Sequence, residues 1–358
     1  MTTTGNNTPR VYIRGMGSIA PWRSADDLAT APAGARLVCQ EPVYEEWIDP
    51  RQLRRMSRII RLGVTAGMMA LREAQVPMPG GIVMGTGYGC MEDTGSFMTK
   101  MVTLREEALN PTPFIQSTHN TIGSQLALLL GCQAYNQTFT QGAFSFEHAL
   151  LDAVLHVKED PSRTLLAGGV DEVTDVSHAL WKRFGVFRED GVRSLRMFKE
   201  GGGVLHGEGA ACFLLAGVPS ATDVATVEGI ETFYKPSQVV LQRRVEQFLA
   251  SAGITATDVD VVLAGAGGAS QDDALLAELC RTSFGGSSRG FYKHLCGEYP
   301  VATAFACWLG ADILRAGRVP EGVLQVDAGR TPRYVLVFNQ YFGTHYSLVL
   351  LRSCRATA

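Results

Sequence analysis

The sequence carries little net charge and none of the cysteine patterns typical of secreted or metal-binding proteins. Its 358 residues include 32 basic and 35 acidic side chains, a formal net charge of −3. This balance argues against a general nucleic-acid binder, because phosphate neutralisation needs a clustered excess of Lys and Arg. The eight cysteines form no C-x-x-C pair and lie mostly in apolar runs. We therefore expect reduced, buried thiols and no metal centre.

A targeting or membrane segment is also missing. The first residues, MTTTGNNTPR, contain no charged region followed by an apolar core, and the longest apolar run, VATAFACWLGADIL, is too short to span a bilayer. With 46% hydrophobic and 19% charged residues, the composition predicts a soluble globular protein with a large core. A cytoplasmic location is the default expectation.

Glycine, by contrast, is abundant. The 39 glycines cluster where strand-like runs meet turns, as in GGIVMGTGYGC and VDVVLAGAGGAS, which indicates close backbone approach or positive φ. Between the clusters lie helical patterns, including DPRQLRRMSRIIRLGVTAGMMALREA and SFEHALLDAVLHV, in which apolar residues recur every three or four positions. This alternation predicts an α/β protein with a largely parallel, helix-covered sheet.

The same arrangement begins again after residue 218. A strand-like segment, ATVEGIETF, precedes an amphipathic helix, SQVVLQRRVEQFLASAG, and the buried strand VDVVLAGAGG. A long apolar helix from about Pro300 and two closing strands complete the chain. We therefore predict two similar halves, residues 10–217 and 223–353.

Taken in order, these segments resemble the β-ketoacyl synthase family of the thiolase fold over nearly the whole chain. RRMSRIIRLGVTAGMMAL is similar to the family's early helix, GTGYGCMEDT to its Gly-rich strand end and NTIGSQLALLLGCQAYN to its dimer-interface helix. Three later signatures are matched by LLAGGVDEVT, MFKEGGGVLHGEGAACFLLA and FGTHYSLVL. The resemblance implies a thiolase-like fold with two similar βαβ halves in a five-layered αβαβα arrangement.

The family's acyl-accepting Cys lies at a helix N-terminus, and the matching stretch here is TFTQGAFSFEHALLDA, residues 138–153. Counting back 25 residues from Gly168, the first residue of GGVDE, places Ala143 at the Cys position. A methyl group forms no thioester. The resemblance therefore implies a scaffold without its nucleophile.

Both family histidines are replaced as well. The first matches Gly265 in LAGAGGASQDD, an alignment supported by Asp273 at the position of a later family Asp. The second matches Glu298 in KHLCGEYP, where the family Lys is retained as Lys293. In active members both imidazoles donate hydrogen bonds that stabilise an enolate oxygen, whereas glycine has no donor and a carboxylate repels that charge. We interpret Lys293 and Glu298 as a structural ion pair.

Without the Cys and the two histidines, the sequence resembles the chain-length-factor subunits of the family. Among these it most resembles the aryl-polyene or flexirubin type II polyketide group. The resemblance implies an inactive subunit that forms a heterodimer, or a higher oligomer, with an active ketosynthase and helps set chain length on an acyl carrier protein. It implies no cofactor. Decarboxylating relatives replace the Cys by Gln but keep both histidines, so Gln141 is either a pocket residue or a strand-end polar residue.

The resemblance also assigns a chain-length gate and a subunit interface. The segment that closes the partner's acyl tunnel in the family matches CMEDTGSFMTKM, whose bulky residues are Phe97, Met98 and Met101. The same residues fit an ordinary core equally well, because Met commonly fills gaps. Asn120 fits either the interface or a helix cap. The positions at the interface or pocket are Phe114, Thr118, Asn120, Gln141 and Phe144.

Basic residues gather in DPRQLRRMSRIIR. At three- and four-residue intervals they share helical faces: Arg51, Arg54, Arg55, Arg58 and Arg61. Acyl carrier proteins are acidic, and related synthases dock them on a basic stretch here. The resemblance therefore makes Arg51, Arg54 and Arg55 a carrier-docking site. A solvated helix face is an equally good interpretation.

Two other classes of protein fit less well. An active acyltransferase would need a different thiol, Cys90 after GTGYG or Cys296 beside Lys293, and no motif places a His base near either. A dinucleotide-binding enzyme is disfavoured because Cys90 takes the sixth position of G-x-G-x-x-G and no acidic ribose contact follows. Irregular spacing disfavours a metal or acid–base role for the histidines His119, His148 and His206.

Overall fold

The computed structural model describes residues 9–23, 36–188, 198, 203–268 and 270–355. Residues 197 and 199–202, in the signature MFKEGGGVLHGEGAACFLLA, lie outside the described residues, as do other parts of the predicted N-terminal half. The predicted boundary falls in the connection between a strand that ends at residue 216 and one that begins at residue 225. The division into two domains stays a prediction, but the strands form two half-sheets of the same design.

The N-terminal half-sheet contains five strands. In spatial order they are β1 (Tyr12–Ile19), β7 (Gly209–Ala216), β5 (Thr164–Asp171), β3 (Gly81–Gly85) and β4 (Tyr135–Phe139). β3 runs parallel to both of its neighbours, whereas β7 is antiparallel to β5 and to β1. All residues of β3 and β7 are buried, as expected for strands that are covered on both faces.

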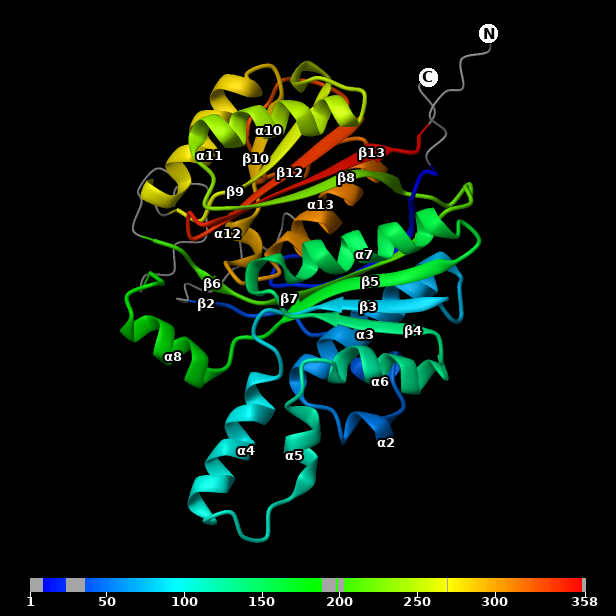
Figure 1. Cartoon of the computed structure of the whole chain (residues 1–358), viewed down its shortest axis with the longest axis vertical. Helices are drawn as coiled ribbons and strands as arrows, with labels where there is room; N and C mark the ends of the chain where they lie inside the picture. The colour runs from blue at the N-terminus through cyan, green and yellow to red at the C-terminus, as the bar shows by residue number, and fades with distance from the viewer. Residues whose placement is uncertain (1–8, 24–35, 189–197, 199–202, 269, 356–358) are drawn as a thin grey trace.

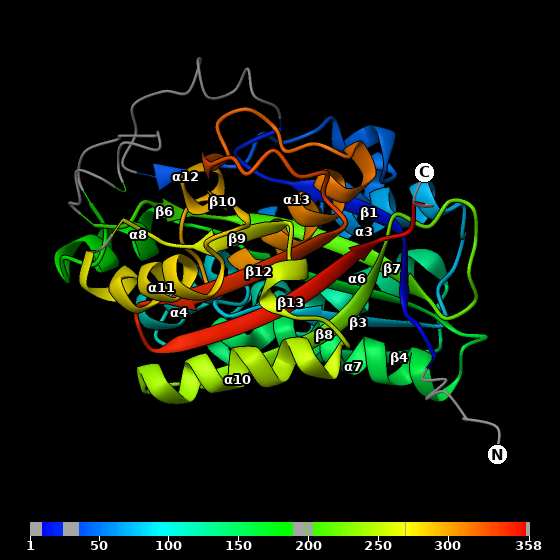
Figure 2. The ribbon, with the colours of Figure 1, turned by 90° about the horizontal axis from the view of Figure 1, so that it is seen from above.

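The C-terminal half-sheet repeats this design. In the same spatial order its strands are β8 (Ala225–Tyr234), β13 (His345–Ser353), β12 (Tyr334–Tyr341), β9 (Val261–Gly265) and β10 (Ser288–Phe291), with β11 (Leu324–Val326) added at the edge. β9 is parallel to both neighbours, and β13 is antiparallel to β12 and β8. Figure 2, seen from above, shows β12 and β13 side by side. Two residue pairs between β1 and β8 join the halves into one sheet. Six of its ten strand pairings are antiparallel, so the prediction of a largely parallel sheet is wrong.

Helices form three layers around and between the half-sheets (Figure 1). The inner layer consists of α7 (Ser145–Glu159) and α13 (Ala302–Ala316). The outer layers are α3 (Arg58–Ala74) with α6 (Thr121–Leu130) on the N-terminal half, and α10 (Gln238–Ser251) with α11 (Ser270–Ser283) on the C-terminal half. The predicted thiolase-like fold, with its five-layered αβαβα arrangement, is therefore confirmed.

The apolar pattern of each helix matches its layer. α13 folds from the run VATAFACWLGADIL and buries residues on all sides because strands of both half-sheets pack against it. α10 buries one stripe only, from Leu241 through Val245 to Phe248 and Leu249. Among the described residues, no helix is both long and apolar enough to cross a membrane.

Glycine brings α3 onto β1. A Cβ atom at Gly15 would lie 2.3 Å from the carbonyl oxygen of Ala70, far inside van der Waals contact. Only a residue without a side chain allows the helix backbone to approach the strand so closely.

The remaining elements connect the layers. They are α2 (Pro50–Leu53), α4 (Met91–Thr103), α5 (Pro111–Gln116), α8 (Asp175–Arg183), α12 (Lys293–Cys296), the strand pair β2 (Arg36–Leu37) and β6 (His206–Gly207), and three 3-10 turns, Tyr44–Glu46, Gly142–Phe144 and Ala256–Asp258. α4 and α5 pack on each other and project from the body at the bottom of Figure 1. We call this pair the arm.

The single helix that we predicted through DPRQLRRMSRIIR is wrong. α2 ends at Leu53 and α3 begins at Arg58, because Ser57 takes an extended backbone conformation with ψ of 168°. The break turns the Arg58 side chain inward, where its guanidinium donates to both carboxylate oxygens of buried Glu208 at 2.8 and 2.5 Å. Arg58 therefore has a structural partner and does not continue the exposed basic face.

Candidate functional site

Ala143 lies at the turn that leads from β4 into α7. The chain makes one 3-10 turn over Gly142–Phe144 and enters the helix at Ser145. Gly142 takes a positive φ of 56°, and the Ser145 hydroxyl donates a hydrogen bond to its carbonyl oxygen at 2.7 Å. Ala143 is 3% exposed. The turn thus presents a buried methyl group at a helix N-terminus, where a thiol would be activated.

Gly265 ends β9 and has no room for a side chain. A Cβ atom there would lie 2.4 Å from Oδ1 of Asn339 and 2.7 Å from Oη of Tyr292. These two groups are buried and held together, because the Tyr292 hydroxyl donates to Asn339 Oδ1 at 2.6 Å. The position matched to the first family histidine is therefore packed for glycine.

Asp273 on α11 holds the turn that follows β9. Its carboxylate accepts hydrogen bonds from the backbone N–H groups of Gly267 and Gly268, at 2.9 and 2.7 Å, and from the Gln340 amide at 2.9 Å. Burial raises the pKa of Asp273, and these hydrogen bonds oppose the rise. The carboxylate therefore ties the end of β9 to the end of β12.

Lys293 and Glu298 form the predicted ion pair. Lys293 Nζ lies 2.6 Å from Glu298 Oε2, and both side chains are 1% exposed. Lys293 also donates to the carbonyl oxygen of Gln340. On the neighbouring α7, Glu147 Oε1 accepts a 2.6 Å hydrogen bond from the Ser347 hydroxyl, and burial raises the pKa of Glu147 while the charge of Lys293 lowers it. The position matched to the second family histidine thus holds a paired carboxylate.

Two half-buried tyrosines lie near the Glu298 carboxylate. Tyr88 follows β3, and Tyr341 is the last residue of β12. Burial raises the pKa of both hydroxyls above the ordinary tyrosine value, and the negative charge of Glu298 is a smaller contribution to each shift. Aromatic side chains therefore lie near Glu298.

His206 reaches the same place from a distant part of the sequence. Its backbone pairs in parallel with that of Glu298. Its ring stacks on Phe187 with ring centroids 4.0 Å apart, and its Nδ1 lies 3.1 Å from Nδ1 of His178. Burial, followed by the charge of His178, lowers the pKa of His206 to about 3. The imidazole is therefore neutral and packed among aromatic rings, and no motif in the sequence indicated that it would lie here.

Neither alternative thiol is suited to catalysis. Cys90 is buried, and burial together with the charges of Asp93, Glu172 and Asp171 raises its pKa, so that the reactive thiolate is disfavoured. Cys296 is fully buried on α12, and its thiol donates to the Gly297 carbonyl oxygen at 3.3 Å. Within the described residues, no group of three or more His, Cys, Asp or Glu side chains is arranged to hold a metal ion.

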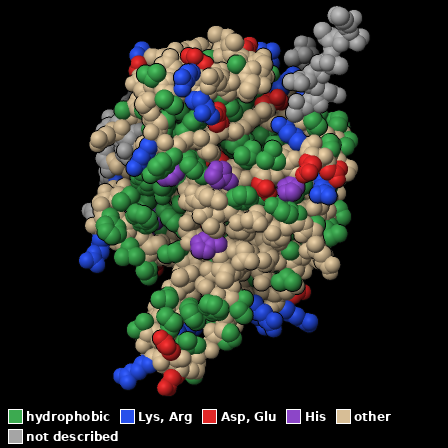
Figure 3. Space-filling model, in the orientation of Figure 1, with side chains coloured by type: hydrophobic (Ala, Val, Ile, Leu, Met, Phe, Trp, Pro, Cys, Tyr) green, Lys and Arg blue, Asp and Glu red, His purple; other side chains and the backbone are tan. Residues whose placement is uncertain are grey.

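The three gate residues lie on the arm. In α4, which is described throughout, Asp93 is the one buried residue, and Met98 is 47% exposed. Phe97 packs on Phe114 of α5 with ring centroids 5.2 Å apart. Figure 3 shows hydrophobic side chains gathered on the arm. The core interpretation of Phe97, Met98 and Met101 is therefore wrong, because the arm stands away from the two half-sheets.

The interface residues also lie at or near the surface. Phe114, Thr118, Asn120 and Gln141 are exposed, and Phe144 is half-buried with its ring 4.7 Å from that of His345. Asn120 takes the N-cap position of α6, as one interpretation predicted, but its side chain makes no capping hydrogen bond there. Asn120 also lines a 550 Å³ groove between α6 and β4, the edge strand of the half-sheet. These positions remain predictions as interface residues.

The carrier-docking residues Arg51, Arg54 and Arg55 are all exposed on and after α2. Arg61 points back, and its Nε donates to the Met56 carbonyl oxygen at 2.9 Å. The exposed basic group is therefore smaller than the sequence predicted.

Comparison with known proteins identifies the family of the chain. The model of the β-ketoacyl synthase N-terminal domain matches residues 42–221, half of the chain. Nodulation protein E of Rhizobium sp. (strain N33) is 26% identical over 305 residues, which cover 77% of this chain and 74% of that protein. 3-Oxoacyl-[acyl-carrier-protein] synthase 2 of Staphylococcus aureus (strain N315) is 22% identical over 244 residues, which cover 59% and 58%.

Solved structures share the fold over almost the whole chain. The ishigamide ketosynthase/chain length factor has a TM-score of 0.79 at 19% identity and covers 97% of this chain and 100% of its own. The ketosynthase ApeO in complex with its chain length factor ApeC from Xenorhabdus doucetiae has a TM-score of 0.78 at 13% identity, with 99% and 100% covered.

Proposed function

Because the chain belongs to the β-ketoacyl synthase family, we propose that it is a catalytically inactive chain length factor that forms a heterodimer with an active ketosynthase. In this role it helps set the length of a polyketide chain, of the aryl-polyene or flexirubin type, on an acyl carrier protein. The observation that carries the proposal is the replacement of the nucleophile and both imidazoles by Ala143, Gly265 and Glu298 on an intact scaffold.

The packing around these positions supports the proposal that the chain is catalytically inactive. Gly265 is enclosed by Asn339 and Tyr292, and Glu298 is neutralised by Lys293. An enolate needs donors aimed at the developing charge, and a carboxylate in an ion pair supplies none.

The exposed surface supports a partner subunit. β4 ends the half-sheet, and its first three residues are exposed. Beside it lie the groove lined by Asn120 and Leu128 and the apolar side chains of the arm. Apolar patches and unpaired strand edges are surfaces that proteins usually cover. The similar ApeO structure is itself a complex with a chain length factor.

Co-expression with a ketosynthase encoded beside it tests the proposal. We expect the two chains to purify together, and we expect the complex to elongate malonyl units on a carrier protein. The isolated chain should release no carbon dioxide from a malonyl thioester and should acquire no acyl group by mass spectrometry. Decarboxylation or acylation by the isolated chain would refute the proposal.

Truncating the gate should lengthen the product. We propose that Phe97, Met98 and Met101 close the partner's acyl tunnel, so Phe97→Ala and Met98→Ala should shift the product distribution by one or more extension units. Chromatography of products from the purified complex measures the shift. Met78→Ala, at an exposed Met outside the arm, is the control and should leave product length unchanged. Unchanged products from the gate variants, at normal complex yield, would contradict the gate.

Charge reversal on and after α2 should weaken carrier binding. We propose that Arg51, Arg54 and Arg55 attract the acidic carrier, so replacing all three with Glu should raise the dissociation constant of the carrier complex on the order of tenfold at low salt. Because exposed charges are screened, the difference should shrink as salt rises. The matched control compares one reversal at each place, Arg54→Glu against Arg243→Glu on the exposed face of α10. Equal effects at both places would show that only net charge matters.

A further inference from the structure

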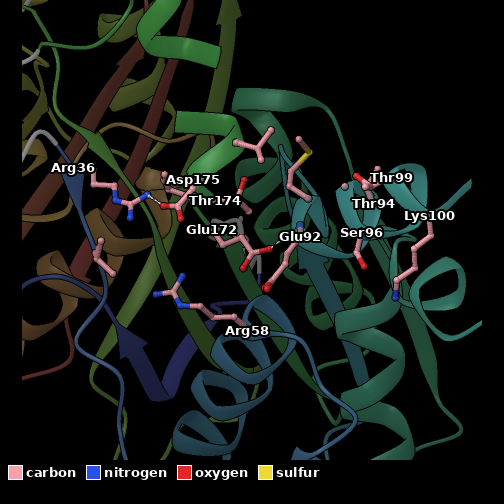
Figure 4. A pocket seen from close by; sticks show the side chains of 15 residues that line it. Arg36, Arg58, Glu92, Thr94, Ser96, Thr99, Lys100, Glu172, Thr174 and Asp175 are labelled. Atoms are coloured by element: carbon pink, nitrogen blue, oxygen red, sulfur yellow. Dashed lines mark hydrogen bonds and ion pairs between the residues drawn. The ribbon is translucent and has the colours of Figure 1, made fainter. Parts of the chain in front are cut away.

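A second pocket lies where α4 begins beside α8 and β2. Its volume is 720 Å³, and its lining includes charged residues from all three elements (Figure 4). The apolar residues Val38 and Val176 also line it and are 47% and 68% exposed. None of the positions matched to catalytic residues lines this pocket.

Within the part of the chain that the structure describes, two of its acidic groups form no ion pair, although the charge of Arg58 acts on one of them, Glu172. Arg36 pairs with Asp175, with 2.7 Å between Nη1 and Oδ1, and Arg58 pairs with Glu208 and with Glu41. The carboxylates that remain are those of Glu92 and Glu172, which Figure 4 shows close together. Lys100 lies on the other side of the pocket in the same view. The wall formed by Glu92 and Glu172 therefore carries excess negative charge.

The charge of Glu172 is less well stabilised than that of Glu92. Its residue is 1% exposed, and among the described residues its one hydrogen bond is a long contact of 3.4 Å from the Glu92 N–H to Oε1. Burial, and next the charge of Glu92, raise the pKa of Glu172 to about 7, although the Glu92 N–H and the charge of Arg58 oppose the rise. A carboxylate that is buried beside a like charge is costly unless a cation joins it.

We infer that this pocket receives a cationic side chain, the ammonium of a Lys or the guanidinium of an Arg, from the ketosynthase subunit. The inference rests on the proposed function, which supplies that subunit. The charge of Glu172 and Glu92 complements such a group. Val38 and Val176 form apolar surface at the pocket, which a protein partner would cover and a small free amine would leave in water. The pocket also adjoins α4, which carries the proposed gate.

The test is the dissociation constant of the complex with the co-expressed ketosynthase. Glu172→Gln keeps the shape of the side chain and removes its charge, and it should raise the dissociation constant about tenfold or more. Glu92→Gln should raise it several-fold. Glu92 is exposed, so its replacement does not threaten folding. In the isolated chain Glu92→Gln should raise the thermal midpoint, because it removes a like charge beside Glu172. Weaker binding with a more stable isolated chain is a combination that a purely structural role would not give.

Glu246→Gln on exposed α10 makes the same charge change elsewhere and should leave the affinity unchanged. Unchanged affinity in both pocket variants, with a wild-type complex that forms, would overturn this inference alone. A wild-type chain that binds no ketosynthase would overturn the proposed function and the inference with it. Spermidine serves as the free-amine probe: a Glu172-dependent rise in the thermal midpoint of the isolated chain at millimolar spermidine would assign the pocket to a free amine and overturn the partner assignment.

Discussion

Replacing Lys293 by Met is expected to lower the free energy of unfolding by about 3–5 kcal/mol. Both members of the Lys293–Glu298 pair are 1% exposed, and their charged atoms are 2.6 Å apart. Removal of the ammonium leaves the Glu298 carboxylate buried without its counter-charge, and that residual charge, more than the loss of the pair itself, causes the destabilisation. Urea denaturation of the isolated chain, followed by circular dichroism, measures the effect.

A double variant separates the effect of losing the ion pair from the effect of leaving one buried charge unpaired. Lys293→Met combined with Glu298→Leu removes both charges, so the double variant should recover most of the lost stability. It should still bind the ketosynthase, because these residues are expected to support the fold and not the reaction. A loss below about 1 kcal/mol in Lys293→Met, the range of exposed pairs, would contradict a structural role for the pair.

Adding a single methyl group at Gly265 is expected to cost about 3 kcal/mol or more. The new Cβ atom would lie 2.4 Å from Asn339 Oδ1 and 2.7 Å from Tyr292 Oη, and both partners are buried and bonded to each other. Relief of the clash would require this hydrogen bond to break or β9 to shift against β12. Thermal and urea denaturation of Gly265→Ala measure the cost.

Gly95→Ala is the matched control. Gly95 lies inside α4, and a Cβ atom there would meet nothing within 4 Å. Alanine should therefore stabilise the helix by about 1 kcal/mol. Similar stability changes in the two variants would mean that the space around Gly265 is not closed. If Gly265→Ala is strongly destabilising, the loss of the first imidazole is built into the packing and a single reverse substitution cannot restore it.

Much of the architecture was predictable from local patterns. Glycine clusters marked the ends of β3 and β9, and three- and four-residue periodicity marked α7 and α10. The all-round apolar run from Pro300 became the inner helix α13. These predictions succeeded because strand alternation, helix periodicity and glycine content depend on residues that are close in sequence.

The predictions that failed, or that the sequence left open, share one cause: they depend on contacts between segments far apart in the chain. The helix predicted through Arg51 to Arg61 is interrupted at Ser57, and the break lets Arg58 pair with Glu208, a residue far along the chain. Phe97 and Met98 looked as suitable for a core as for a gate, and only the projection of the arm separates the two interpretations. A run of hydrophobic residues indicates that a surface will be covered. It does not indicate whether the same chain or another chain covers that surface.

The amino-acid sequence by itself determined the order of the elements and the absence of a thiol and two imidazoles at the matched positions, since residue identity and local spacing suffice for both. Only the tertiary structure decided that Gly265 has no space for a side chain, that His206 lies beside Glu298, and that Glu92 and Glu172 share a pocket. Each of these depends on the packing of segments far apart in the chain, which local pattern does not encode.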